Sequence, residues 1–280
     1  MVMDDYFYWI SFSFNALSFI PYILILIAYY KRRDSFNQTM KINIHFCIIC
    51  FLLNTSYLFP IYKNGWCELQ GSLYVTSYVI AFLFNLLISF LFFMKTIYPN
   101  VVEKRQSIFY LGFPLLFWVL FLGLFLYQVL ECSFYKNVIG FCRLKKDQVI
   151  YLSLLVLSFI SAGLSVLLIV IMIIYIIKMA GEEKVSQYFR KIITVAVLQL
   201  FCVLLVAITR ILEKNSLPES FFKIIDIFQC MLWPFLICLF SLTGATRREI
   251  ANLFKCNHEE EENKESTRDR NTLNISLTLL

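Results

Sequence analysis

Seven long apolar runs constrain the fold of this chain more than any other feature of its sequence. A bilayer core of about 30 Å requires roughly 20 apolar residues in a helix, and each run comes close to that length or exceeds it. The runs are Tyr8–Tyr30, Ile42–Tyr62, Leu69–Met94, Ser107–Leu130, Val149–Ile177, Ile192–Leu212 and Phe221–Thr243. We therefore expect an all-α fold, a bundle of seven transmembrane helices that itself carries the function.

The composition agrees with an integral membrane protein. Hydrophobic residues make up 60% of the 280 residues, against 45–50% in typical soluble domains. Charged residues make up only 16% and cluster between the runs. The expected organisation is a short extracellular N-terminus, one membrane domain, a short amphipathic eighth helix and a disordered cytoplasmic tail, over residues 1–7, 8–245, 246–256 and 257–280 respectively.

The distribution of cations predicts the orientation of the bundle. Lys and Arg collect on the cytoplasmic side of membrane proteins. With the N-terminus outside, 17 of the 25 Lys and Arg residues fall inside and 8 outside. Asp4 and Asp5 precede the first run without any cation, so that run is expected to be an uncleaved span rather than a signal peptide. The C-terminus is then cytoplasmic, and the expected location is the plasma membrane.

The sequence lacks chemical groups that several classes of membrane protein need, which weighs against an ion-coupled transporter, a pump or a voltage-gated channel. No Asp, Glu, Lys or Arg lies in the middle of a run, and intramembrane charges mark ion paths, proton relays and voltage sensors. No metalloprotease, serine-hydrolase or P-loop motif occurs. His45 and His258 are the only histidines, too few for a histidine-rich metal site. We expect no catalytic activity, no metal and no cofactor.

Three cysteines flank the expected outer face. Cys67 opens the third run, and Cys132 and Cys142 lie in the longest outer loop, from Glu131 to Gln148. That loop would face an oxidising compartment, where disulfides persist. We expect one of its two cysteines to bridge to Cys67 and so to hold the loop over the mouth of the bundle.

Polar side chains near the outer ends of the runs are the candidate ligand site. Asp226 and Gln229 lie three residues apart and share a helix face, and Arg210 is placed to pair with Asp226. For each residue, hydrogen bonding between helices is the alternative role. The candidates are Thr76, Gln128, Arg143, Gln199, Arg210, Asp226 and Gln229.

The second outer loop carries an unusual excess of cations for an outer segment. These cations are Lys136, Arg143, Lys145 and Lys146. One hypothesis is that they attract a small anionic ligand, such as a nucleotide or an organic acid. The alternative is a solvated loop or one in contact with lipid headgroups.

Together with these features, several short motifs resemble a G-protein-coupled receptor of the slime-mould cyclic-AMP-receptor-like group and the related secretin-like group. In those families a cysteine followed closely by Gln-Gly opens the third span, as Cys67, Gln70 and Gly71 do here. A second cysteine shortly before the fifth span matches Cys142 in GFCRL. The resemblance implies a Cys67–Cys142 disulfide. It also places His45, in INIHFCIICFLLN, in an inner polar network.

The resemblance implies a cell-surface receptor that binds an extracellular ligand in the outer half of the bundle and activates a heterotrimeric G protein. Cyclic AMP does not carry over, because no ligand-contacting residues are recognised. The third run ends in FFMKTIYPN without DRY, and the last lacks NPxxY, unlike rhodopsin-like receptors. The alternative is a seven-span facilitator of a small solute, although such transporters contain repeated three-helix halves that this sequence does not show.

Basic residues on the inner side are the expected contacts of the G protein. They are accompanied by Tyr98 and by TRREIANLFK at Thr246–Lys255, whose apolar residues have the spacing of a helix lying along the membrane surface. Cys256 follows directly as a candidate for palmitoylation. The expected contacts are Lys95, Tyr98, Arg190, Lys191, Arg247 and Arg248.

Overall fold

The computed structural model describes residues 2–32, 38–58, 66–136, 142–145 and 149–180, together with Phe201 and Phe228. The first five apolar runs fall largely within these ranges. Phe201 of the sixth run and Phe228 of the seventh form an edge-to-face ring pair with centroids 5.8 Å apart. The rest of those two runs, the expected helix at 246–256 and the tail lie outside the described residues.

Helices occupy each of the first five runs. They are α1 (Val2–Arg32), α2 (Gln38–Ser56), α3 (Trp66–Ile97), α5 (Phe113–Glu131) and α6 (Val149–Ala180). A short helix α4 (Pro99–Lys104) follows α3, and a π-helical turn η1 (Ile108–Gly112) leads into α5.

Three helices in the described part of the chain are long and apolar enough to cross a membrane. They cover Trp66–Ile97, Ile108–Glu131 and Leu152–Tyr175, while α1 and α2 contain shorter apolar helices at Asn15–Tyr30 and Lys41–Ser56. These lengths agree with a membrane protein. The count of seven spans and an outside N-terminus remain predictions.

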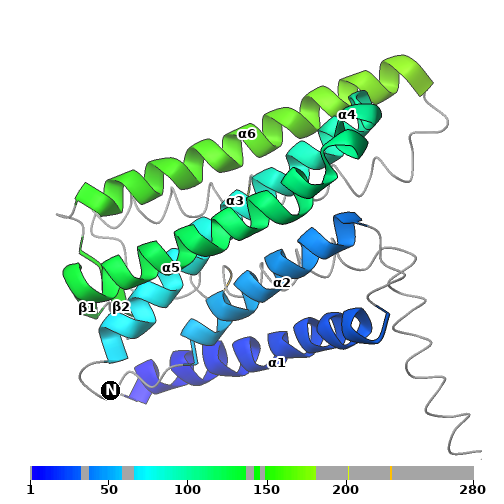
Figure 1. Ribbon diagram of the computed structural model, residues 1–280. Helices are drawn as coiled ribbons and strands as arrows, with labels where there is room; N and C mark the ends of the chain where they lie inside the picture. Colours follow the sequence, from blue (N-terminus) through cyan, green and yellow to red (C-terminus); the bar gives the residue numbers. More distant parts are fainter. Residues whose placement is uncertain are drawn as a thin grey trace, which may run out of the picture.

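Helix α3 is the central element of the described bundle. It packs against α2, α5 and α6, and α1 packs against the far side of α2 (Figure 1). Ile80, Phe84, Ile88 and Leu91 recur at helical spacing along α3 and are fully buried. This apolar stripe is the core against which the neighbouring helices pack.

Helix α5, by contrast, exposes large apolar side chains over most of its surface. Leu115, Leu116, Val119 and Leu122 are all about half exposed or more. A contiguous apolar surface of this extent is unfavourable in water, whereas a helix with apolar residues all round is typical of a membrane span. The exposed face of α5 therefore agrees with contact to lipid.

A β-hairpin joins α5 to α6, in a segment for which the sequence analysis expected only a loop. Strands β1 (Phe134–Lys136) and β2 (Cys142–Leu144) are antiparallel. Phe134 pairs with Leu144, and Lys136 pairs with Cys142. The all-α class therefore describes the helical bundle, and this two-stranded sheet is an addition at one end of it. We call that end the hairpin end.

Candidate functional site

A disulfide bond fastens the hairpin to the first turn of α3. The Cα atoms of Cys67 and Cys142 are 5.2 Å apart and the sulfurs are bonded, a separation within the usual disulfide range. The pairing is the one that the family resemblance implied. Closing a loop of 75 residues stabilises the folded state by about 4 kcal/mol in the chain-entropy account. Cys132, the alternative partner, is a free thiol.

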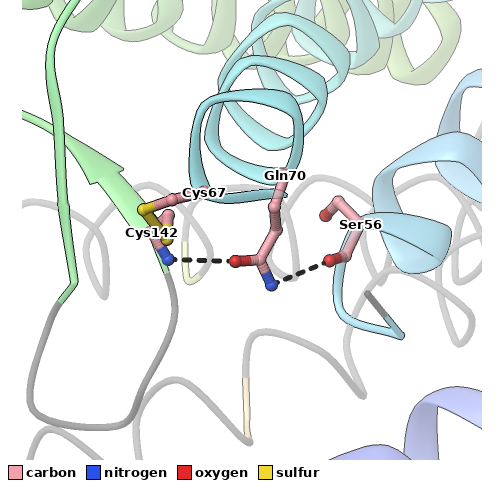
Figure 2. Close-up of a disulfide and its surroundings, with 4 residues drawn as sticks. All are labelled: Ser56, Cys67, Gln70 and Cys142. Atoms are coloured by element: carbon pink, nitrogen blue, oxygen red, sulfur yellow. Dashed lines mark hydrogen bonds between the residues drawn. A yellow bond between two sulfur atoms is a disulfide. The ribbon is translucent and has the colours of Figure 1, made fainter. Parts of the chain in front are cut away.

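Gln70 adds a second attachment one turn further along α3. Its amide nitrogen Nε2 donates a 3.0 Å hydrogen bond to the carbonyl oxygen of Ser56, and its Oε1 accepts a 3.1 Å bond from the backbone N–H of Cys142 (Figure 2). The Ser56 carbonyl belongs to the last turn of α2, where carbonyls have no partner within the helix. One buried side chain therefore joins α2, α3 and β2.

Gly71 provides a third attachment by allowing close approach. A Cβ atom built at Gly71 would lie only 2.6 Å from Cε1 of Phe134, the first residue of β1. The missing side chain lets the Phe134 ring lie directly on the α3 backbone. Because Cys67, Gln70 and Gly71 are spaced at i, i+3 and i+4, they share one face of α3, and all three hold the hairpin.

The hairpin is therefore fixed rather than loosely tethered. Cys142 and Leu144 of β2 are almost completely buried, and the backbone N–H of Lys145 donates to the carbonyl of Ser133 at 3.1 Å. The side chain of Lys145 is exposed. A preordered loop lowers the entropy lost when a ligand binds against it.

The expected ligand residues divide into two groups. Thr76 on α3 and Gln128 on α5 are fully buried, and neither their side-chain oxygens nor the Gln128 amide nitrogen has a hydrogen-bond partner in the described part of the chain. The backbone of Arg143 lies in β2 opposite Tyr135. The remaining candidates, Gln199, Arg210, Asp226 and Gln229, lie outside the described residues.

Three serines buried on α6 did not feature among the expected residues. Ser158, Ser161 and Ser165 are spaced at three and four positions and are all buried, so they form one face of a helix that packs against α3. The signal was present in the sequence as a serine repeat at helical spacing within an apolar run. Their burial becomes visible only in the packed structure.

His45 lies where α2, α3 and α5 meet. The Trp118 indole nitrogen donates a hydrogen bond of 3.2 Å to Nδ1 of His45. The imidazole also stacks on Phe84, with ring centroids 6.1 Å apart and an angle of 11° between the planes. The described surroundings of His45 thus combine one polar partner with aromatic rings.

At the end of α3 opposite the hairpin, two of the expected G-protein contacts are described. The Lys95 ammonium lies 5.5 Å from the ring centroid of Tyr110, a cation–π geometry that ties α3 to η1. Tyr98, just before α4, is 53% exposed and so is available to a partner. Arg190, Lys191, Arg247, Arg248 and the palmitoylation candidate Cys256 lie outside the described residues.

Comparison with known proteins finds no family model that matches the chain and no curated protein that is significantly similar to it. Within the described ranges, no group of three or more His, Cys, Asp or Glu residues is arranged to hold a metal ion.

Proposed function

We propose that this chain is a seven-transmembrane cell-surface receptor that binds an extracellular ligand at the hairpin end and activates a heterotrimeric G protein. The observation that carries the proposal is the hairpin held on α3 by Cys67, Gln70 and Gly71. A loop fastened in this way forms a preordered rim for a binding site between the helices. In this proposal the hairpin end is extracellular, where a disulfide is stable.

The central position of α3 supports a route from that rim to the opposite end. Helix α3 holds the hairpin at its first turn and packs against α2, α5 and α6 along its length. A ligand that binds one arrangement of these helices more tightly shifts the population toward that arrangement. The shift would change how α3 and its neighbours present Lys95 and Tyr98 to the G protein.

On the cytoplasmic side, the proposed interface combines Lys95 and Tyr98 with residues predicted from sequence. These are Arg190, Lys191, Arg247 and Arg248. An acyl chain on Cys256 would hold the predicted terminal helix at the membrane. The C-terminus is cytoplasmic and the membrane is the plasma membrane in this proposal.

The test is nucleotide exchange on G proteins in membranes that contain the full chain. Membranes are challenged with a panel of small neutral molecules, small anions, peptides and lipids, and each G-protein class is assayed. The proposal expects at least one compound to raise the exchange rate several-fold, and expects Cys142→Ser to reduce that response at equal surface expression. Absence of any response, together with solute flux in vesicles that contain the chain, would favour the facilitator instead.

A further inference from the structure

Several buried hydrogen-bonding side chains near the hairpin end, Ser77 on α3 among them, have no partner within the described part of the chain. We call three of them, Ser72 and Thr76 on α3 and Gln128 on α5, the polar cluster. All three side chains are completely buried. The Ser72 hydroxyl, the Thr76 hydroxyl and both amide atoms of Gln128 lack hydrogen bonds to the described chain. Buried polar groups in native proteins are nearly always paired, so this concentration requires an explanation.

The packing of α3 on α5 places these residues at one level of the bundle. Phe84 and Phe117 form a ring contact with centroids 5.1 Å apart, which fixes the register of the two antiparallel helices. Gln128 follows Phe117 by eleven positions, and Leu73 precedes Phe84 by the same number. Gln128 therefore lies at the level of Leu73, between Ser72 and Thr76.

A second contact agrees that the end of α5 lies near the first turns of α3. The Phe134 ring lies on Gly71, and Phe134 follows Glu131, the last residue of α5, by three positions. Gln128 precedes Glu131 by three positions, so it lies about one turn further from the hairpin than the end of α5. The Phe84–Phe117 contact thus places Gln128 within a turn of Ser72 and Thr76, and the Phe134–Gly71 contact is compatible with that level.

Helical spacing also indicates which face of each helix carries these residues. Eleven residues make almost exactly three helical turns, so Gln128 projects from the same face of α5 as Phe117, the face that contacts α3. Ser72 and Thr76 are four residues apart and share a face of α3. Gln128 therefore lies at the α3–α5 packing surface, and Ser72 and Thr76 lie on one face of α3 at the same level of the bundle.

Helix α6, which also packs against α3, carries buried hydroxyl groups of its own. Ser158 is satisfied by a 2.9 Å bond from its hydroxyl to the carbonyl of Leu154, whereas the buried Ser165 hydroxyl has no partner among the described residues. The polar cluster itself offers a carboxamide and two hydroxyls. None of the buried residues of the described chain is Asp, Glu, Lys or Arg.

We propose that Ser72, Thr76 and Gln128 bind a small uncharged molecule that carries adjacent hydrogen-bond donors and acceptors, such as a polyol or a carboxamide. Gln128 offers two donor hydrogens and an acceptor oxygen, and each hydroxyl offers both functions. An anion would lose its hydration among neutral groups without gaining a counter-charge. This inference rests on the proposed function, in which the occupant is the receptor's ligand.

The test is thermal unfolding of the detergent-solubilised full chain with matched neutral and charged probes. The neutral probes are D-glucose, myo-inositol and nicotinamide, and their charged counterparts are glucose 6-phosphate, myo-inositol 1-phosphate and nicotinate. A specific neutral probe at about ten times its Kd is expected to raise Tm by roughly 3 °C. The rise should saturate with concentration, and the charged counterpart should produce none.

Two apolar substitutions of similar shape, Gln128→Leu and Thr76→Val, test the polar cluster separately. Each is expected to weaken binding of the stabilising probe at least tenfold. Ser153→Ala is the matched control, because Ser153 is exposed on α6 and bonds only to the carbonyl of Val149 in the described chain. This control should leave the probe's effect unchanged.

Three outcomes overturn the inference. One is that no neutral probe raises Tm. Another is an equal rise in the wild type and in both variants, which is the general effect of osmolytes on folded proteins. The third is that a charged probe binds more tightly than its neutral counterpart.

Nucleotide exchange on G proteins is measured in parallel with the same probes. Binding without exchange contradicts the proposed function alone, whereas exchange driven by a compound that does not depend on Gln128 or Thr76 contradicts only this inference.

Discussion

The indole nitrogen of Trp118 donates a hydrogen bond of 3.2 Å to Nδ1 of His45, joining α5 to α2 across the face of α3. Because Nδ1 accepts this bond, the neutral imidazole carries its proton on Nε2. The Phe84 ring of α3 stacks on the same imidazole. Three helices thus meet at one polar bond enclosed by aromatic rings.

Removing the donor of this bond should lower stability. Trp118→Phe keeps an aromatic ring but leaves Nδ1 of His45 without its partner, and we expect a loss of about 1 kcal/mol in the free energy of unfolding. Unfolding in a denaturing detergent measures the loss. It is followed by far-ultraviolet circular dichroism of the backbone, which does not depend on tryptophan fluorescence. Tyr127→Phe is the control, because Tyr127 lies on the exposed side of α5. An equal loss in both variants would show that the bond does not stabilise the bundle.

Gly71→Ala should displace the hairpin, because its Cβ atom would overlap the Phe134 ring. Overpacking of this kind costs about 1–3 kcal/mol. Gly123→Ala on α5 is the matched control, since a Cβ atom there would meet nothing within 4 Å. Alanine favours the helix over glycine by up to about 1 kcal/mol, so the control should be neutral or stabilising. Thermal unfolding of both variants in the same detergent compares them.

A double variant checks the cause of the Gly71→Ala effect. Phe134→Ala removes the ring that the new methyl group would meet, so adding it to Gly71→Ala should cost less than the two separate losses together. Simple additivity would mean that Gly71 acts through something other than Phe134.

The helices and the disulfide were the features that the sequence could predict. An apolar run defines a helix locally, and each of the first five runs contains one. The Cys67–Cys142 pairing followed from the family resemblance and not from the residues alone, which left Cys132 open. The hairpin escaped prediction because strands of three residues have too little alternation to form a pattern.

The candidate site was predictable only in part, because burial depends on how helices pack. Thr76 and Gln128 were recognisable as polar residues within apolar runs, but their proximity depends on the α3–α5 register set by Phe84 and Phe117. The burial of the α6 serines likewise depends on how α6 packs against α3. Gln70 matched a family motif, yet its bond to Ser56 depends on where α2 ends.

Cys132 should react slowly with alkylating reagents near neutral pH. Partial burial, and secondarily the negative charge of Glu131, raise the pKa of the Cys132 thiol above its ordinary value of 9.0. The thiolate is the reactive form, so the labelling rate should stay low at pH 7–8 and increase as the pH passes that ordinary value. Iodoacetamide labelling, followed by mass spectrometry of the peptide that contains Cys132, measures the rate at each pH.

Glu131→Gln separates the two causes of this pKa shift. Removing the carboxylate should lower the pKa of Cys132 and accelerate its labelling at pH 8, while burial keeps the pKa above 9.0. Cys132→Ser identifies the signal by abolishing it. Rapid labelling of the wild type at neutral pH, or no response to Glu131→Gln, would contradict this account of the thiol.

Gln70→Ala should loosen the hairpin although the disulfide remains. The substitution leaves the buried backbone N–H of Cys142 and the carbonyl of Ser56 without the side chain that pairs them, and each unpaired group costs about 1–3 kcal/mol. We expect a lower Tm and faster amide hydrogen exchange in Cys142–Leu144. Gln106→Ala is the control, because Gln106 is exposed near the opposite end of the bundle.

Gln70→Glu keeps an acceptor for Cys142 but places a carboxylate against the Ser56 carbonyl, so it should not restore stability. If hydrogen exchange in β2 were unchanged in Gln70→Ala, the disulfide alone would hold the hairpin.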